Sequence, residues 1–304
     1  MSCIGHEKII SFFDACISER TLSHAYVFSG PRHVGKRTIA HYIARTILGI
    51  PQDHALMHPD LIVVQRELDE KTETLKKDIS VVQIRDLIHR LSQSAFTKDG
   101  YTVAIVDGAE HMNAAGANAL LKTLEEPRAR TIVFLITQDE YTLLPTIRSR
   151  TQSIYFSPVG AEKIKQYLES VGIDSGRAGE YARESHGLPG YAYDWAHDAT
   201  LYDDHMSLKQ RCISLMHIPF YEKIKKIEEF FQDKDDHIEA RSRIIDMLGV
   251  WTFTLRDIMI LHSSNSESRY VASQALDSIR QAEKQLKQNI HPRLILEHIM
   301  LALP

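Results

Sequence analysis

Continuous runs of apolar residues, separated by turns and helical stripes, organise the first half of the chain. The runs expected to form strands are residues 25–28, 61–64, 103–106, 132–136 and 151–156. Apolar runs that do not alternate with polar residues are typical of strands buried on both faces of a parallel sheet. Amphipathic stripes at helical spacing lie between or before them, over residues 7–17, 36–48 and 80–91. The pattern predicts an α/β fold in which helices flank a parallel sheet.

The pattern changes at Ser157-Pro158-Val159-Gly160. Two short amphipathic helices are predicted after it, over residues 162–171 and 178–184. From about residue 203 onward, apolar positions recur only at helical spacing. We therefore predict three domains, formed by residues 1–157, 158–202 and 203–304.

Composition restricts the classes of function. With 304 residues, 43% hydrophobic and 25% charged, the chain can bury a full core. Its net charge of -4 gives no general attraction to nucleic-acid phosphates, so a free-standing DNA-binding protein is disfavoured. Three cysteines without paired spacing argue against a disulfide framework and a four-cysteine zinc site. We find no signal peptide and no membrane-spanning run, and we expect a cytoplasmic protein.

A candidate phosphate loop follows the first predicted strand. Gly30, Gly35 and Lys36 stand where a working loop places its glycines and its phosphate-binding lysine. Arg37 occupies the position at which Ser or Thr would hold Mg²⁺. Thr38 comes one residue later, which turns its side chain by about 100° around the helix. Two interpretations stay open, a loop that still binds ATP or ADP and an inherited turn that binds nothing.

Two further segments resemble a known family. Asn118-Ala-Leu-Leu-Lys-Thr-Leu-Glu-Glu-Pro127, followed by Thr146-Ile-Arg-Ser-Arg150, resembles the clamp-loader branch of the AAA+ proteins. The resemblance covers nearly the whole chain and is thinnest between residues 200 and 285. It implies an AAA+ P-loop core (1–157), a small helical lid (158–202) and a helical collar for oligomerisation (203–304).

The resemblance also implies that the hydrolytic machinery is incomplete. Asp107 ends its strand as the metal-binding acid would, but Gly108 stands where a water-polarising glutamate is expected. Glu110 is displaced, and a displaced carboxylate is a poor general base. Tyr191 stands after the glycine turn of the lid, where active relatives carry an arginine. Thr137 matches the sensor position, although a threonine that caps a strand end is an equal alternative.

Arg150 matches the family's arginine finger, the residue that reaches the ATP site of a neighbouring subunit. The family pattern is Ser-Arg-Cys, and this chain has Ser149-Arg150-Thr151. An arginine supplied in trans stabilises the charge that develops on the transferred phosphoryl group, worth about 10³-fold or more in rate. The alternative is an ordinary surface salt bridge.

The expected function is that of an accessory, ATPase-deficient subunit of a bacterial replicative clamp loader, the one serving DNA polymerase III. The resemblance implies gamma/tau and delta subunits as partners, with the sliding clamp and primed DNA reached through the assembly. It implies that the chain itself requires no cofactor. The alternatives are an ATP-hydrolysing gamma/tau-like subunit and a scaffold that binds neither nucleotide nor neighbours.

A metal site is a further hypothesis for the segment before the second strand. His54 and His58 are four residues apart and flanked by aspartates, but no cysteine accompanies them. A polar loop is the alternative interpretation.

Overall fold

The chain divides into two compact units, residues 1–196 and 197–304. The computed structural model describes residues 3–51, 58–69, 75–97, 100–230, 237–261, 266–287 and 290–303. Among these residues, no helix has both the length and the apolar character needed to cross a membrane.

The first unit is built on a five-stranded sheet in the order β2-β3-β4-β1-β5. All its strand pairs are parallel, and Tyr26 of β1 aligns with Phe134 on one side and Gln152 on the other. The strands are β1 Ala25–Ser29, β2 Leu61–Val64, β3 Thr102–Asp107, β4 Thr131–Ile136 and β5 Gln152–Tyr155. Because parallel strands end at the same edge, the residues that follow β1, β3 and β4 meet there.

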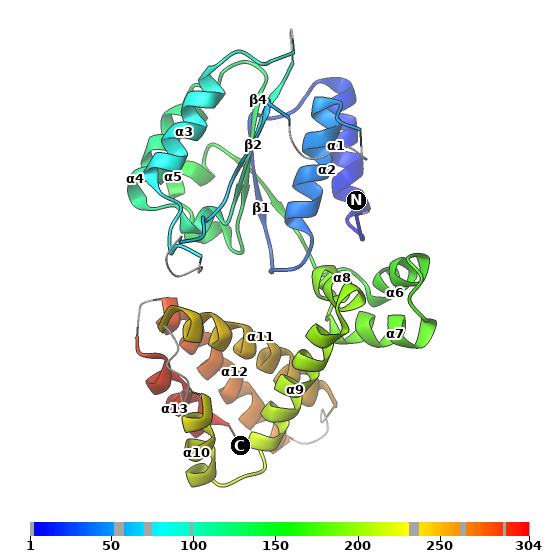
Figure 1. Cartoon of the computed structure of the whole chain (residues 1–304), viewed down its shortest axis with the longest axis vertical. Coiled ribbons are helices and arrows are strands. Elements are labelled where there is room, and N and C mark those ends of the chain that lie inside the picture. Colours follow the sequence, from blue (N-terminus) through cyan, green and yellow to red (C-terminus); the bar gives the residue numbers. More distant parts are fainter. Residues whose placement is uncertain are drawn as a thin grey trace. The chain divides into compact units, whose positions relative to one another are not determined.

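Helices cover both faces of this sheet (Figure 1), α1 and α2 on one face and α3, α4 and α5 on the other. Their bounds are α1 Glu7–Glu19, α2 Lys36–Leu48, α3 Val81–Ser92, α4 Ala114–Glu125 and α5 Pro145–Arg148. Neighbouring residues of one strand serve opposite faces. Tyr26, Phe28 and Phe134 surround Phe13 of α1, with ring centroids 4.9 to 5.9 Å from it. The intervening residues Ala25, Val27, Val133 and Leu135 join the aliphatic core on the other side.

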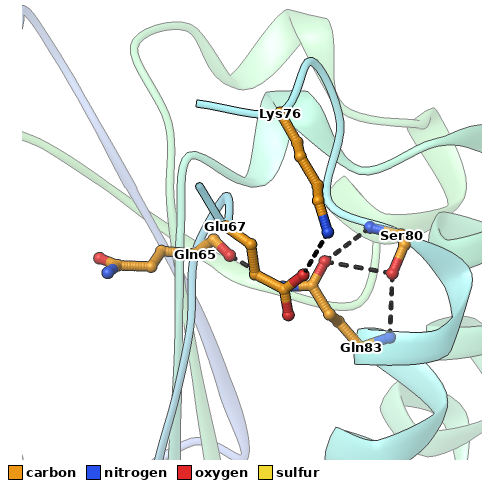
Figure 2. Close-up of polar contacts among 5 residues, drawn as sticks. All are labelled: Gln65, Glu67, Lys76, Ser80 and Gln83. Atoms are coloured by element: carbon orange, nitrogen blue, oxygen red, sulfur yellow. Dashed lines mark hydrogen bonds and ion pairs between the residues drawn. The ribbon is translucent and has the colours of Figure 1, made fainter. Parts of the chain in front are cut away.

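Local capping fixes where α3 begins. The Ser80 hydroxyl accepts from the Gln83 backbone N–H at 3.3 Å, and the Gln83 side chain accepts from the Ser80 N–H at 2.9 Å. Figure 2 shows that the Gln83 amide also donates to the Gln65 carbonyl, at 2.9 Å, just beyond β2. Lys76 and Glu67 pair beside them at 2.9 Å. These contacts join the end of a strand to the start of a helix.

The remainder of the first unit is helical. It comprises α6 Ala161–Ser170, α7 Ser175–Glu184 and the start of α8 Pro189–His197. Lys163 of α6 pairs with Glu7 of α1 at 2.7 Å. The Val159 N–H donates to the Gly187 carbonyl at 2.8 Å, which ties the chain leaving the sheet to the loop before α8.

The second unit is all-helical where described. Its helices are α9 Ala199–Leu215, α10 Phe220–Phe230, α11 His237–Leu261, α12 Ser266–Lys287 and α13 Pro292–Ala302. Trp251 is fully buried in a core with Leu215, Ile279 and Leu296. The buried Lys223 ammonium donates to the Leu303 carbonyl at 2.9 Å, so α10 holds the end of α13.

The α/β fold class of the sequence prediction is confirmed, and all five predicted strands match to within a residue at each end. The separation of a core (1–157) from a lid (158–202) remains a prediction, since residues 158–196 lie in the same compact unit as the core. The predicted boundary between residues 202 and 203 falls inside α9, which begins where the Asp198 carboxylate accepts from the Thr200 N–H at 2.9 Å.

Candidate functional site

The loop between β1 and α2 has a backbone that needs glycine at two positions. Gly30 has φ 138°, and a Cβ there would lie 2.5 Å from the Phe156 carbonyl oxygen. Gly35 has φ 105° but little around it, since a Cβ would meet only His6, at 4.0 Å. Gly30 therefore lets β1 pass close to the end of β5, whereas Gly35 allows the turn into α2.

Lys36 is the first residue of α2 and is only 7% exposed. Its ammonium donates to the carbonyls of Gly30 and Pro31, each at 2.6 Å, so the side chain arches back over the loop. Burial lowers the pKa of Lys36 to about 8, an effect partly offset by the carboxylates of Glu110 and Asp107.

Arg37 and Asp107 contact each other directly. A guanidinium nitrogen of Arg37 lies 3.4 Å from a carboxylate oxygen of Asp107. Burial raises the pKa of Asp107, and the Arg37 charge opposes that shift. Thr38 lies half-buried in the first turn of α2, and its hydroxyl makes no hydrogen bond within the described part of the chain. The two positions that would share Mg²⁺ in an active phosphate loop are therefore joined by an ion pair, and a metal does not fit this set of residues.

The end of β4 lies beside the loop. The Gly30 N–H donates to the Gln138 carbonyl at 3.2 Å. Thr137 is buried, and its hydroxyl donates to the Asp139 carbonyl at 3.0 Å, as expected of a residue that caps a strand end. One carboxylate oxygen of Glu110 accepts from the Gln138 N–H at 3.4 Å, and the other is buried without a partner among the described groups.

The loop also contacts α8, the last helix of the first unit. The His33 ring stacks on Tyr191 with centroids 4.1 Å apart, and the His33 carbonyl accepts from the Gly190 N–H at 2.8 Å. Asp194 lies 3.9 Å from the His33 ring nitrogen. Burial lowers the pKa of His33 to about 4, with the charges of Arg32 and Lys36 acting in the same direction. Tyr191 of α8 thus packs directly against the loop.

Arg150 lies at a separate place, just after α5. Its guanidinium pairs with Glu125 at the end of α4, at 2.7 Å. It also donates to the Thr146 carbonyl at 3.0 Å and the Ser149 hydroxyl at 3.1 Å. The side chain remains 34% exposed. The salt bridge named as an alternative is therefore present within this chain.

His58 and Asp60 lie close together before β2, with 4.0 Å between a ring nitrogen and a carboxylate oxygen. His54, the other residue of the metal hypothesis, lies outside the described residues. Across the described residues, no group of three or more His, Cys, Asp or Glu side chains is arranged to hold a metal ion.

The structure places Gly30, Gly35 and Lys36 in or next to the loop between β1 and α2 and brings Asp107 against Arg37, while a nucleotide-binding role for these residues, Thr38 and Thr137 stays a prediction. Sequence patterns did not predict that Glu125 pairs with Arg150 or that Tyr191 stacks on His33. Glu125 lies in the family motif of residues 118–127, so the sequence did single it out as a residue of interest. Tyr191 was noted only because it stands where an arginine was expected.

Comparisons with known proteins agree with this architecture. Residues 5–160 match the protein family described as "DNA polymerase III, delta subunit". The DNA polymerase III subunit delta' of Pseudomonas aeruginosa is 38% identical over 142 residues, covering 42% of this chain and 41% of that protein. Subunit delta' of Bacillus subtilis is 26% identical over 338 aligned residues, covering 97% of this chain and 95% of that protein.

The matches also extend to another subunit type. DNA polymerase III subunit tau of Salmonella typhimurium is 30% identical over 178 residues, covering 55% of this chain and 27% of that protein. The matched segments thus span less than half the length of the Pseudomonas and Salmonella relatives. The family match covers just over half of the chain, including the phosphate loop, Asp107 and Arg150. The chain therefore belongs to the DNA polymerase III delta subunit family, in which it resembles the delta' subunits.

Proposed function

We propose that the chain is an ATPase-deficient subunit of a bacterial replicative clamp loader and that it provides Arg150 to the ATP site of a neighbouring subunit. Its relatives are named as delta', tau and gamma/tau subunits of DNA polymerase III. On this proposal its partners are gamma/tau and delta, and it reaches the sliding clamp and primed DNA through the assembly. The second unit would serve as the collar through which the subunits assemble. The cytoplasmic location remains a prediction.

The main observation that supports the proposed lack of hydrolysis is the ion pair between Arg37 and Asp107, 3.4 Å apart. Phosphoryl transfer in these folds depends on Mg²⁺ held between the loop hydroxyl and the strand-end aspartate. Here a guanidinium lies against that aspartate instead. Gly108 supplies no carboxylate to polarise water, and Tyr191 replaces the lid arginine. These departures disfavour the alternative of an ATP-hydrolysing gamma/tau-like subunit.

The trans-acting role of Arg150 is supported by how the residue is held. An ion pair as exposed as the one with Glu125 contributes only about 0–1 kcal/mol, because water screens both charges. A phosphate group from a neighbour offers more negative charge and bidentate acceptors for the same guanidinium. The cost of exchanging Glu125 for a phosphate is therefore small.

ATP turnover tests the proposal in a reconstituted system. The purified chain alone should show no multiple turnover, and neither should the Arg37→Thr variant, because Gly108 and Tyr191 remain. Addition of the wild-type chain to gamma/tau and delta subunits from the same organism should raise their turnover in the presence of clamp and primed DNA. Multiple turnover by the isolated chain, or no effect on the other subunits, would contradict the proposal.

A further inference from the structure

A small cavity, open to solvent, lies between α6 and α7 in the first unit. Its volume is about 220 Å³, below the roughly 300–1,000 Å³ of most small-molecule sites, so it admits a small chemical group rather than a whole nucleotide. Three residues of α6 and three of α7 line it, namely Ala161, Glu162, Lys165, Gly179, Ala182 and Arg183. None of them belongs to the loop between β1 and α2, so the cavity is separate from that loop.

One wall of the cavity is a glycine that the backbone does not require. Gly179 lies in the interior of α7, where glycine makes a helix less stable than alanine does. A Cβ at this position would make only ordinary contacts, 3.5 Å from a guanidinium nitrogen of Arg183 and 3.9 Å from Cε of Lys165. Neither strain nor crowding therefore excludes alanine. The remaining effect of the glycine is to leave space between these two side chains.

Two cationic side chains approach this space from different helices. The Lys165 ammonium of α6 pairs with Glu169 on its own helix, at 3.7 Å. The Arg183 side chain of α7 is exposed and makes no hydrogen bond or ion pair within the described part of the chain. Its five N–H donors are therefore available to a ligand. Because like charges repel, an anion between the two cations would be favourable.

Glu162 is the acidic side chain among the lining residues. Its carboxylate accepts from the Gln166 amide at 3.4 Å, and no ion pair within the described residues joins it to Lys165 or Arg183. The lining thus carries two cations against one carboxylate. This net positive charge attracts an anion to the cavity.

We propose that the cavity between α6 and α7 is a binding site for a phosphate group, held by the Arg183 guanidinium and the Lys165 ammonium beside Gly179. A phosphate group carries about two negative charges at neutral pH, which matches the two cations. Its oxygens suit the planar fork of a guanidinium, whereas the ammonium acts as a point charge. A bound phosphate joins a residue of α6 to a residue of α7 and so stabilises this pair of helices.

Nuclear magnetic resonance of the full chain tests the inference residue by residue. Inorganic phosphate is titrated at constant ionic strength, and sodium acetate and sodium chloride are titrated in parallel. We expect a saturable shift of the Gly179 amide signal with phosphate and at most weak shifts with the other two salts. An equal response to chloride would show ionic screening only, and a preference for acetate would show a carboxylate site. Shifts confined to residues 30–38 would assign the phosphate to the loop, and each of these three outcomes would overturn the inference.

Variants of α7 separate a binding role from a structural one. Arg183→Gln removes the charge from an exposed side chain and should weaken phosphate binding by about tenfold or more, as expected for loss of a charged hydrogen bond. Gly179→Ala should also weaken binding, because its methyl group would occupy the space between the two cations. The same variant should raise the midpoint of thermal unfolding, since alanine favours the helix. Arg177→Gln removes another exposed arginine from α7, outside the lining of the cavity, and should leave binding unchanged.

Thermal unfolding gives a second measurement of the same site. Phosphate should raise the midpoint of the wild type increasingly with its concentration, and Arg183→Gln should abolish this rise. Binding that is undiminished in both Arg183→Gln and Gly179→Ala would contradict the inference. An equal loss of binding in Arg177→Gln and Arg183→Gln would also contradict it, because general surface charge would then account for the effect.

Discussion

Lys36 and Arg150, the two basic residues at the centre of the proposed function, are held in opposite ways. Lys36 is 7% exposed and bonds to backbone carbonyls of its own loop. Arg150 is 34% exposed and bonds mainly to the carboxylate of Glu125. Changes in the phosphate loop and α2 should therefore affect the stability and binding of this chain itself. Changes at the Arg150 pair should leave stability nearly intact and appear only in an assembled complex.

The largest effect on stability is expected from Gly30→Ala. Its Cβ would lie 2.5 Å from the Phe156 carbonyl oxygen at a φ of 138°. Overlap with backbone together with strain should lower the free energy of unfolding by about 3 kcal/mol. Gly49→Ala is the matched control, since its φ is 65° and no atom lies within 4 Å, and it should cost about 1 kcal/mol. Equal urea midpoints for the two variants would show that the loop is not tightly packed against β5.

The next largest effect on stability is expected from acidification, through protonation of His41 in α2. This side chain is 3% exposed, neither ring nitrogen has a partner among the described groups, and its pKa is lowered from 6.5 to about 4. Burial is the main cause, followed by the charges of Arg37 and Arg45. The pKa of His41 is lower in the folded protein than in the unfolded chain. The stability of the folded state is therefore unaffected by this residue above pH 6.5 and decreases as the pH falls from 6.5 toward 4, because the unfolded chain takes up a proton first.

The loss from His41 should be about 2 kcal/mol between roughly pH 7 and pH 5. His41→Leu keeps an apolar side chain in the buried position and should flatten the dependence of stability on pH over that range. Unfolding in urea at several pH values measures both proteins. A variant with the same pH dependence as the wild type would show that His41 becomes protonated without cost in the folded state.

A smaller effect is expected where α8 meets the loop. Tyr191 stacks on His33 at 4.1 Å and on Trp195 at 5.7 Å. Removal of the ring in Tyr191→Ala should lower stability by about 1 to 2 kcal/mol, whereas Tyr191→Phe should cost less because the stack is kept. Thermal unfolding of both variants distinguishes stacking from the hydroxyl, and an equal loss in the two would assign the effect to the hydroxyl.

The smallest effect is expected from Glu125→Ala. Loss of an exposed ion pair should change the free energy of unfolding by less than about 1 kcal/mol, and the difference should shrink further at high salt. Denaturation in low and high salt measures it. A loss of several kcal/mol would mean that the pair holds α4 and α5 in place, which would favour a structural role for Arg150.

The sheet was predictable from the sequence because buried parallel strands are continuous apolar runs, as in Val103, Ala104, Ile105 and Val106. The loop was predictable because its residues are adjacent in sequence. The Glu125 to Arg150 and His33 to Tyr191 contacts depend on how separate helices pack, which local spacing does not encode. The boundary predicted at residue 203 falls inside α9, which begins at its Asp198 cap, because the buried positions of α9 lie later than its first residues.

Clamp loading by a reassembled complex tests the central claim most directly, with Arg150→Ala compared against Glu125→Ala. Both variants break the same ion pair, but only the first removes the guanidinium. The account predicts that Arg150→Ala lowers the rate of placing the sliding clamp on primed DNA by about tenfold or more, with unchanged assembly and thermal stability, while Glu125→Ala stays near the wild-type rate. Equal losses in both variants, or a wild-type rate with Arg150→Ala, would contradict a role for Arg150 in the neighbouring ATP site.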